Sequence, residues 1–392
     1  MLMVASFYRV MSLFLIHDLS GYEFILIQGF KVSRQFFPSR SRKKSQNHLV
    51  KTKPKPMHLN LPLARADEDE SLSSLRQSFA SDGFVKLPGV LSSDAVDALN
   101  RRLEHVLRGT YDRGDKPDKT PKLIKLRMAT QYDDGGDEKK DEHDVRNRKT
   151  KPGGGKIGPL GFTGSRQNAK VLQVINVHKC DRLFRELATN ASLGRMVAKL
   201  AGWKHGARLA QDQVWAKPPG SPPLTYHRDS PYFMFAPSSV VTVWVAFDDM
   251  VEELGPLVYV RGSHKWGEGR VGSAGTFFQR DGGVSLLISA AEREGLDFEE
   301  DVKFVSMEGL LAGGISIHDG RCWHGSGSNR SECNPRRGLG LHFVPAEVRF
   351  TADAAKSRLY RSYVEPCIES GQNIGDIELP EEDFPIVWTP DM

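Results

Sequence analysis

The sequence predicts a mainly β fold with flanking helices, arranged as a β-sandwich or jelly roll. One observation is a series of short strand-like segments beyond residue 206, separated by turns of Gly, Pro, Ser and Asn. A second is a stretch of helical apolar spacing that precedes these segments in the chain. Short strands with frequent turns behind a helical layer are typical of these β folds.

The helical layer is expected between residues 69 and 202. Residues 69–80 have helical apolar spacing with Gly83 as the expected stop, and a short strand and turn follow over 84–92. Residues 92–107 begin with Ser and Asp, which favour helix starts, and then repeat apolar residues at helical spacing. Residues 171–202 are also helical in period.

Five strands are then expected from runs of β-branched and aromatic residues. They are ARLAQDQVWAK (207–217), VVTVWVAFDD (240–249), PLVYVRG (256–262), GGISIHD (313–319) and GLGLHFVPA (338–346).

The chain is predicted to hold a single folded domain over residues 57–392, preceded by a basic extension. Residues 1–56 contain ten basic and two acidic residues, which gives this segment a net charge of +8. The whole chain has a net charge of +5, so the remaining residues carry −3. The extension is a mitochondrial or peroxisomal targeting segment, a disordered tail, or an untranslated stretch before a true start at Met57. The protein is expected in the cytoplasm, or in one of these organelles if the segment is a targeting signal. Within the domain, the charged and Gly-rich residues 109–168 form either an exposed loop or a lid over a site.

Composition excludes several classes of protein. The mildly acidic body gives no reason to expect nucleic-acid binding, and no apolar run is long enough for a membrane-spanning helix. The run GGGKI over 153–157 fails the phosphate-loop pattern, because Ile157 stands where Ser or Thr must contact Mg²⁺. The four cysteines lack a Cys-x-x-Cys spacing, which suits a reducing compartment.

A His-x-Asp pair and one distant histidine carry the predicted chemistry. His227 and Asp229 lie in TYHRDSPYF, and His324 follows in CWHGSGSN. Residues i and i+2 of an extended segment point to the same side, so an imidazole and a carboxylate meet there. Two histidines and one carboxylate with open positions form the facial triad of non-haem Fe(II) oxygenases. Three such ligands alone also fit a zinc site.

Arg336 and Ser326 are the candidate residues for an organic cosubstrate. An Fe(II) site that uses O₂ needs an electron source, and the usual one is 2-oxoglutarate. Its far carboxylate needs a planar, permanently charged partner, which arginine provides, and Ser326 adds a hydroxyl two residues past His324. Arg337 is the adjacent competitor, because strand alternation allows only one of the two arginines to point inward.

Two long segments resemble the phytanoyl-CoA dioxygenase family of Fe(II)/2-oxoglutarate oxygenases. They are HRDSPYFMFAPSSVVTVWVAFDDMVEELGPLVYVRGSH and HDGRCWHGSGSNRSECNPRRGLGLHF. The run QDQVWAKPPGS resembles the same family's approach to its His-x-Asp motif, and the similarity covers roughly residues 75–345.

The resemblance implies a double-stranded β-helix (a cupin-like jelly roll), Fe(II), 2-oxoglutarate and O₂. It makes His227, Asp229 and His324 the iron ligands. It also gives a cosubstrate site of Arg336, favoured over Arg337 by counting back from His342, together with Ser326, Trp244, Lys217 and Gln213.

The expected function is hydroxylation of an unactivated C–H bond in a small organic or acyl substrate, with release of succinate and CO₂. Two alternatives stay open: a cupin-type zinc or manganese hydrolase or isomerase, and a non-catalytic binding protein of the same family. Three nearby residues are expected to be structural: His318 as a satisfied strand histidine, His178 as a buried helical residue, and Cys322 as a bystander.

Overall fold

The computed structural model describes residues 57–61, 70–120, 171–267 and 283–392. These residues all belong to one compact unit, Lys55–Met392. The extension predicted over residues 1–56 and most of the loop predicted over 109–168 lie outside the described residues. Their proposed roles as targeting segment and lid therefore stay predictions.

The helices of the described residues agree with the expected N-terminal layer and add two more beyond it. They are α2 (Glu70–Asp82), α3 (Ser93–Leu107), α5 (Arg182–Ala188), α6 (Ala191–Ala201), α7 (Val284–Arg293) and α8 (Arg361–Ser370). Helix α3 starts at the expected residue, because the Ser92 hydroxyl accepts a hydrogen bond from the backbone N–H of Ala95. Gly83, with φ at +87°, follows the end of α2.

A large antiparallel sheet, here the major sheet, has the strand order β1-β9-β6-β11-β3-β13, with β2 also paired to β3. Its strands are β1 (Phe84–Leu87), β9 (Ile315–Asp319), β6 (Val241–Ala246), β11 (Arg336–Pro345), β3 (Ala207–Lys217), β13 (Ile386–Trp388) and β2 (Leu172–Ile175).

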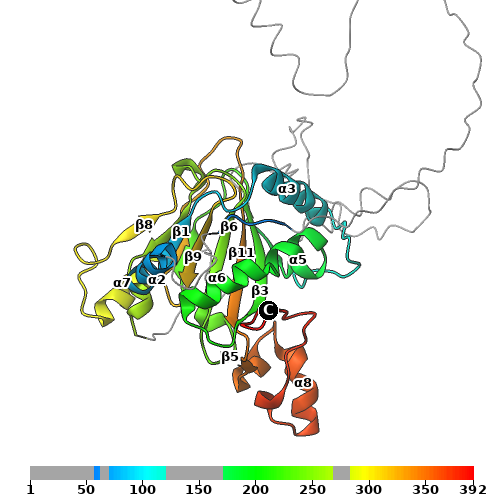
Figure 1. The fold of residues 1–392 in the computed structure, drawn as a ribbon. Coiled ribbons are helices and arrows are strands. Elements are labelled where there is room, and N and C mark those ends of the chain that lie inside the picture. Colours follow the sequence, from blue (N-terminus) through cyan, green and yellow to red (C-terminus); the bar gives the residue numbers. More distant parts are fainter. Residues whose placement is uncertain (1–56, 62–69, 121–170, 268–282) are drawn as a thin grey trace, which may run out of the picture. The chain divides into compact units, whose positions relative to one another are not determined.

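A second antiparallel sheet, the minor sheet, has the order β4-β10-β7-β8, and a two-stranded ribbon pairs β12 with β5. The minor-sheet strands are β4 (Leu224–His227), β10 (His324–Ser326), β7 (Leu257–Val260) and β8 (Phe304–Ser306). The ribbon strands are β5 (Phe235–Ala236) and β12 (Arg349–Phe350). The prediction of a mainly β fold with flanking helices is confirmed (Figure 1).

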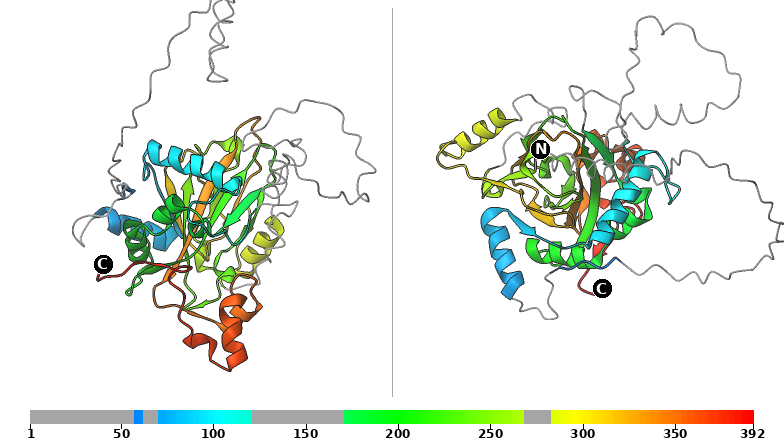
Figure 2. Two further views of the ribbon diagram at one scale, coloured as in Figure 1. Left: turned by 90° about the vertical axis from the view of Figure 1, so that its right-hand side faces the viewer. Right: turned by 90° about the horizontal axis from the view of Figure 1, so that it is seen from above.

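The outer face of the major sheet is apolar and is covered by helices. Leu339, Leu341 and Phe343 alternate along β11, are fully buried, and belong to one core cluster with residues of α3, α5 and α6. The view from above in Figure 2 shows α2, α3 and α6 along this face. Successive side chains of a strand point to opposite faces, so the residues between these three point to the other side.

The inner face of the major sheet is polar and faces the minor sheet. On β11 it carries Arg336 and His342, which are paired in register with Lys217 of β3 and Thr242 of β6. Gly338 lies between them on the same face. A Cβ atom there would lie 2.5 Å from the Trp244 ring, so glycine lets the indole lie across β11. This face supplies one half of the candidate site.

The helical segment predicted over residues 171–202 is wrong in its first part, because Leu172–Ile175 form β2. The strand pairs with β3 from Leu172 opposite Ala216 to Ile175 opposite Gln213. The short apolar run LQVI fits either a helical or a strand period, and the open edge of β3 decides in favour of the strand. The helical part begins later, where the Asp181 carboxylate accepts hydrogen bonds from the first N–H groups of α5.

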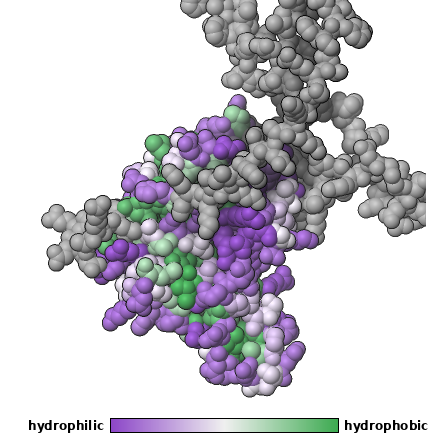
Figure 3. All heavy atoms as spheres, turned by 45° about the vertical axis from the view of Figure 1, so that its right-hand side comes forward, coloured by the Kyte–Doolittle hydropathy of each residue, from purple (hydrophilic) through white to green (hydrophobic). Residues whose placement is uncertain are grey.

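The C-terminal residues form a small apolar cluster of their own that the sequence did not predict. Phe350, Tyr360, Val364 and Phe384 pack with Phe235 of the ribbon, and β13 adds an edge to the major sheet. Hydrophilic residues cover most of the described surface in Figure 3, and hydrophobic ones form smaller areas between them. Among the described helices, none is long and apolar enough to cross a membrane.

Candidate active site

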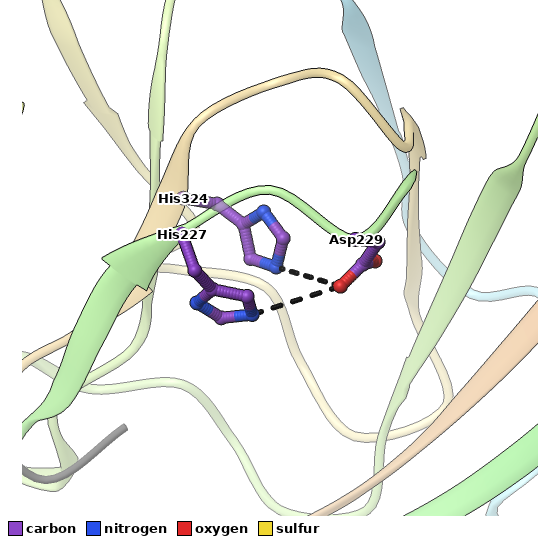
Figure 4. A group of neighbouring side chains, drawn as sticks. All are labelled: His227, Asp229 and His324. Carbon is purple, nitrogen blue, oxygen red and sulfur yellow. Dashed lines mark ion pairs between the residues drawn. The ribbon is translucent and has the colours of Figure 1, made fainter. Parts of the chain in front are cut away.

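His227, Asp229 and His324 converge between the two sheets, as the sequence predicted. His227 ends β4 and His324 begins β10; the two residues are paired in register, with ring centroids 4.3 Å apart. Their Nε2 atoms lie 3.6 and 3.7 Å from Oδ1 of Asp229, which follows β4 (Figure 4). One ligand atom from each residue lies within 4.8 Å of the others, and all three residues are buried, an arrangement that could hold one metal ion.

Backbone carbonyls fix the protonation of both imidazoles. Nδ1 of His227 lies 2.7 Å from the Thr225 carbonyl oxygen, and Nδ1 of His324 lies 3.0 Å from that of Cys322. A carbonyl only accepts, so each Nδ1 carries the proton and donates it. Each Nε2 is therefore left with its lone pair toward Asp229, which is the form of imidazole that binds a metal.

The second carboxylate oxygen of Asp229 is held by the major sheet. Thr242 of β6 donates its hydroxyl to Oδ2 at 2.6 Å, and His318 of β9 donates Nε2–H to the same oxygen at 3.1 Å. The backbone N–H of Asp229 donates to the Gly320 carbonyl at 2.8 Å. These contacts fix the carboxylate so that Oδ1 faces the two imidazoles.

His318 is a satisfied strand histidine, as expected, and it also links the site to the interior. Its Nδ1 lies 3.1 Å from the Tyr259 hydroxyl, which in turn lies 2.8 Å from Ser316 Oγ. Because Nε2 of His318 donates to Asp229, Nδ1 accepts from Tyr259 and Tyr259 accepts from Ser316. A chain of hydrogen bonds thus runs from β9 through β7 to the carboxylate.

The charge distribution suits a cation between these groups. Burial opposes ionisation of Asp229, but the surrounding histidines, among them His318 through its hydrogen bond to Oδ2, outweigh it and hold the pKa of the carboxyl well below its ordinary range. Burial and then His227 lower the pKa of His324 well below its ordinary value. The site therefore presents a carboxylate and neutral imidazole.

A second group of polar residues lies next to this cluster. Arg336 is 2% exposed; its Nη1 donates to the Gly255 carbonyl at 3.0 Å, and its guanidinium carbon lies 5.7 Å from the centre of the Trp244 ring. Lys217, opposite Arg336 on β3, donates from Nζ to Ser326 Oγ at 3.3 Å. Four of the five predicted cosubstrate residues are thus brought together near His324.

Arg336 points inward and Arg337 does not. Arg337 faces the other side of β11, where its backbone N–H donates to Asp248 Oδ2 at 2.6 Å and its guanidinium forms an ion pair with the same carboxylate. Strand alternation explains why only one of the two arginines reaches the inner face.

Comparisons with known proteins agree with this geometry. The family model for phytanoyl-CoA dioxygenase (PhyH) matches residues 79–338, more than half of the chain. The chain belongs to the phytanoyl-CoA dioxygenase family. The enzymes of this family use Fe(II), 2-oxoglutarate and O₂, the cofactors expected from the sequence. A search of curated proteins found no significant match.

Two solved structures show the same fold. One is the non-heme alpha ketoglutarate dependent epimerase SnoN from nogalamycin biosynthesis, 19% identical, with a TM-score of 0.52 over 81% of this chain and 98% of that one. The other is the carbocyclase SnoK from the same biosynthesis, 18% identical, with a TM-score of 0.51 over 81% and 96%. The double-stranded β-helix implied by the phytanoyl-CoA dioxygenase resemblance is confirmed.

One predicted member of the cosubstrate group lies apart from the rest. Gln213 is on the inner face of β3, four residues before Lys217, and its amide bonds to Gln173 and Gln211 at 2.8 Å each. These neighbouring amides engage both ends of its side chain, so it stands out less than Lys217 as a contact for a cosubstrate.

Sequence reasoning missed several residues that surround Asp229, although the strand period contained a signal. Thr242 lies two residues before Trp244 on β6, and His342 lies six residues after Arg336 on β11, so each shares a face with a predicted residue. His342 Nδ1 lies 2.9 Å from the Thr242 hydroxyl. Tyr259 carried no comparable signal, because its role depends on which strand of the other sheet it meets.

Proposed function

We propose that the protein is an Fe(II)- and 2-oxoglutarate-dependent dioxygenase that hydroxylates a C–H bond of a small organic or acyl substrate. The observation that carries the proposal is the convergence of the two lone-pair Nε2 atoms and one Asp229 oxygen in a buried site. Family membership supports the cofactors, and the neighbouring buried arginine supports a cosubstrate that carries a carboxylate.

The residues fit an iron ion on the chemistry of their donors. Two neutral imidazoles and one carboxylate match Fe(II), and three protein ligands leave positions free for other molecules. His227, Asp229 and His324 would hold the ion. When bound, the iron and 2-oxoglutarate supply the oxidant, by decarboxylation of the keto acid to succinate and CO₂ with consumption of O₂.

The cosubstrate would be held through its far carboxylate. Arg336 offers a planar, charged fork that has no carboxylate partner among the described residues, and its Nε is buried without a hydrogen-bond partner there. Ser326 adds a hydroxyl from β10, on the strand that also carries His324. Trp244 packs beneath the guanidinium and limits its movement.

The remaining polar residues keep the ligands in place. Thr242 and His318 hold Oδ2 of Asp229, so the carboxylate cannot rotate freely and presents Oδ1 to the imidazoles. The carbonyls of Thr225 and Cys322 hold the two imidazoles in the metal-binding tautomer.

The proposal is tested by a substrate screen that follows succinate release from the iron-loaded protein under ¹⁸O₂. A hydroxylase yields a product with one new labelled oxygen and one succinate per turnover. A zinc or manganese hydrolase would turn over without 2-oxoglutarate, and a binding protein would not turn over.

The same experiment separates hydroxylation from other outcomes. SnoN is described as an epimerase, and a product of that kind would carry no label. Excess chloride in the same assay tests halogenation, which we do not expect because the proposed ligand Asp229 would take a position on the iron that chloride would otherwise fill. An unlabelled or chlorinated product from a coupled substrate would contradict the hydroxylase proposal.

A further inference from the structure

Two buried basic side chains lie side by side next to the candidate metal site. Lys217 is 1% exposed and Arg336 is 2% exposed, and they are opposite one another on β3 and β11. Neither forms an ion pair with an Asp or Glu among the described residues. A buried charge without a counter-charge is costly, so the pair calls for an explanation.

The hydrogen bonds of the two residues converge on one place. Nζ of Lys217 donates to the Ser326 hydroxyl at 3.3 Å and to the Gly327 carbonyl. Arg336 donates from Nη1 to the backbone carbonyl of Gly255. Its Nε is buried and has no hydrogen-bond partner among the described residues. An amine, a guanidinium and a hydroxyl thus lie on neighbouring residues, and all three can donate hydrogen bonds to a carboxylate.

At neutral pH the lysine is uncharged when no anion is present. Burial first, and then the charge of Arg336, lower the pKa of Lys217 to about 6. Burial lowers the pKa of Arg336 only to about 10, so the arginine stays charged. Because the lysine loses its proton, the folded protein does not bury two adjacent positive charges.

The other titratable groups around the pair leave this balance unchanged. Asp248, beyond β6, and Tyr259 of β7 act on Arg336, and Asp248 is already engaged by Arg337. His324 of β10 is held neutral by burial and by His227. Among the described groups, Arg336 is the charged one that shifts Lys217.

We propose that Lys217 is a second cation of the cosubstrate carboxylate site and takes up one proton from solvent when the carboxylate binds. This inference rests on the proposed function and adds a protonation switch to it. The carboxylate remains ionised and no covalent bond changes, so the only exchange is the proton. Once an anion lies between the two side chains, the ammonium form gains a counter-charge that the empty site lacks.

The consequence is a cosubstrate affinity that depends on pH. Below about pH 6 the lysine is charged with or without ligand, so pH has little effect. Above that value, binding takes up a proton, and the affinity falls by up to about tenfold per pH unit until the lysine of the bound state also loses its proton.

Calorimetry tests the proposal without any turnover. The full chain, loaded with Fe(II) under anaerobic conditions, is titrated with 2-oxoglutarate in phosphate and in Tris, whose ionisation enthalpies differ. At about pH 7.5 we expect an uptake close to one proton per bound 2-oxoglutarate, and an affinity that weakens as pH rises further.

Two substitutions at Lys217 remove the titratable amine, one leaving a neutral and the other a permanently charged side chain, and both should abolish the uptake. Lys217→Met should bind with a flat pH profile, about tenfold or more weaker than wild type near pH 6 and similar at high pH. Lys217→Arg should also be flat but at least as tight as wild type. Lys86→Met, which changes an exposed lysine on β1, should leave the uptake unchanged.

The outcomes distinguish this proposal from the proposed function. Binding of 2-oxoglutarate without proton uptake, or with uptake that persists in both Lys217 variants, overturns the role of Lys217 and leaves the function intact. A complete lack of 2-oxoglutarate binding to the metal-loaded chain overturns the proposed function, and this inference with it.

Discussion

Replacing Lys217 with methionine should stabilise the protein in the absence of metal and cosubstrate. Methionine has a similar length and fills the same buried space without a charge to lose. The wild-type lysine must instead release its proton on folding, because burial and Arg336 lower the pKa of its amine to about 6 from 10.5. A residue that serves ligand binding thus costs stability when the site is empty.

The magnitude follows from this difference in pKa. At pH 7 the unfolded chain holds a proton that the folded chain lacks, and the gap between pH 7 and 10.5 corresponds to about 5 kcal/mol. The neutral amine regains about 2 kcal/mol through its two hydrogen bonds, to Ser326 and Gly327. The Lys217→Met variant should therefore be about 3 kcal/mol more stable at pH 7.

The advantage should vanish as pH rises. Between about pH 6 and 10.5 the unfolded wild-type chain binds more protons at this residue, so its free energy of unfolding rises with pH. At pH 9 the cost of deprotonating the wild-type lysine is only about 2 kcal/mol. The two hydrogen bonds of this lysine, which the methionine variant lacks, contribute about as much and offset that cost. The stability difference between variant and wild type should thus be close to zero there.

Urea denaturation of EDTA-treated wild type, Lys217→Met and Lys86→Met at several pH values measures this difference. The exposed Lys86 controls for the gain of a methionine in itself. A stability advantage of Lys217→Met that does not change with pH would refute the proposed loss of a proton on folding. Lower stability of the Lys217→Met protein than of wild type at neutral pH would refute it as well.

Three further predictions concern the site. His324→Ala should lose tightly bound iron, measured by metal analysis after gel filtration; full retention of iron would rule out the proposed ligand set. Arg336→Leu should weaken 2-oxoglutarate binding by about 10- to 150-fold, because a charge-assisted hydrogen bond contributes about 1.5–3 kcal/mol. Arg337→Leu, which breaks only the pair with Asp248, should have a smaller effect in the same calorimetric titration, and the reverse order would shift the assignment by one residue. Thr242→Val should lower iron affinity by about 10- to 100-fold, as expected for loss of a hydrogen bond to a metal-binding carboxylate; an unchanged iron affinity in a chelator competition would argue that Thr242 does not position Asp229.

Local patterns in the sequence were enough to predict strands β1, β3, β6, β7, β9 and β11 and to indicate the candidate ligand residues. The strand expected over 207–217 is β3 to the residue, and the His-x-Asp pair already placed two ligand side chains on one side of the chain. Strand alternation limited the inward arginine to one of two, and the resemblance selected Arg336. These inferences succeed because side-chain direction in a strand repeats every two residues and needs no knowledge of the partner strand.

One prediction failed at a local ambiguity that a neighbouring strand resolved. The run at 171–175 fitted a helix by its period, but the free edge of β3 made it a strand. The deciding partner is distant in the sequence, so the local pattern could not reveal it. The cosubstrate role of Gln213, whose amide bonds to Gln173 and Gln211, stays a prediction.

The sequence by itself therefore determined the fold class, the three candidate ligands and the candidate arginine. The tertiary structure alone decided what surrounds them. It places Thr242 and His318 on the second oxygen of Asp229. It also buries Lys217 opposite Arg336, which lowers the pKa of the lysine amine. The physical reason is that hydrogen-bond partners and pKa values depend on cross-strand register and burial, which the complete fold creates and no short stretch of sequence contains.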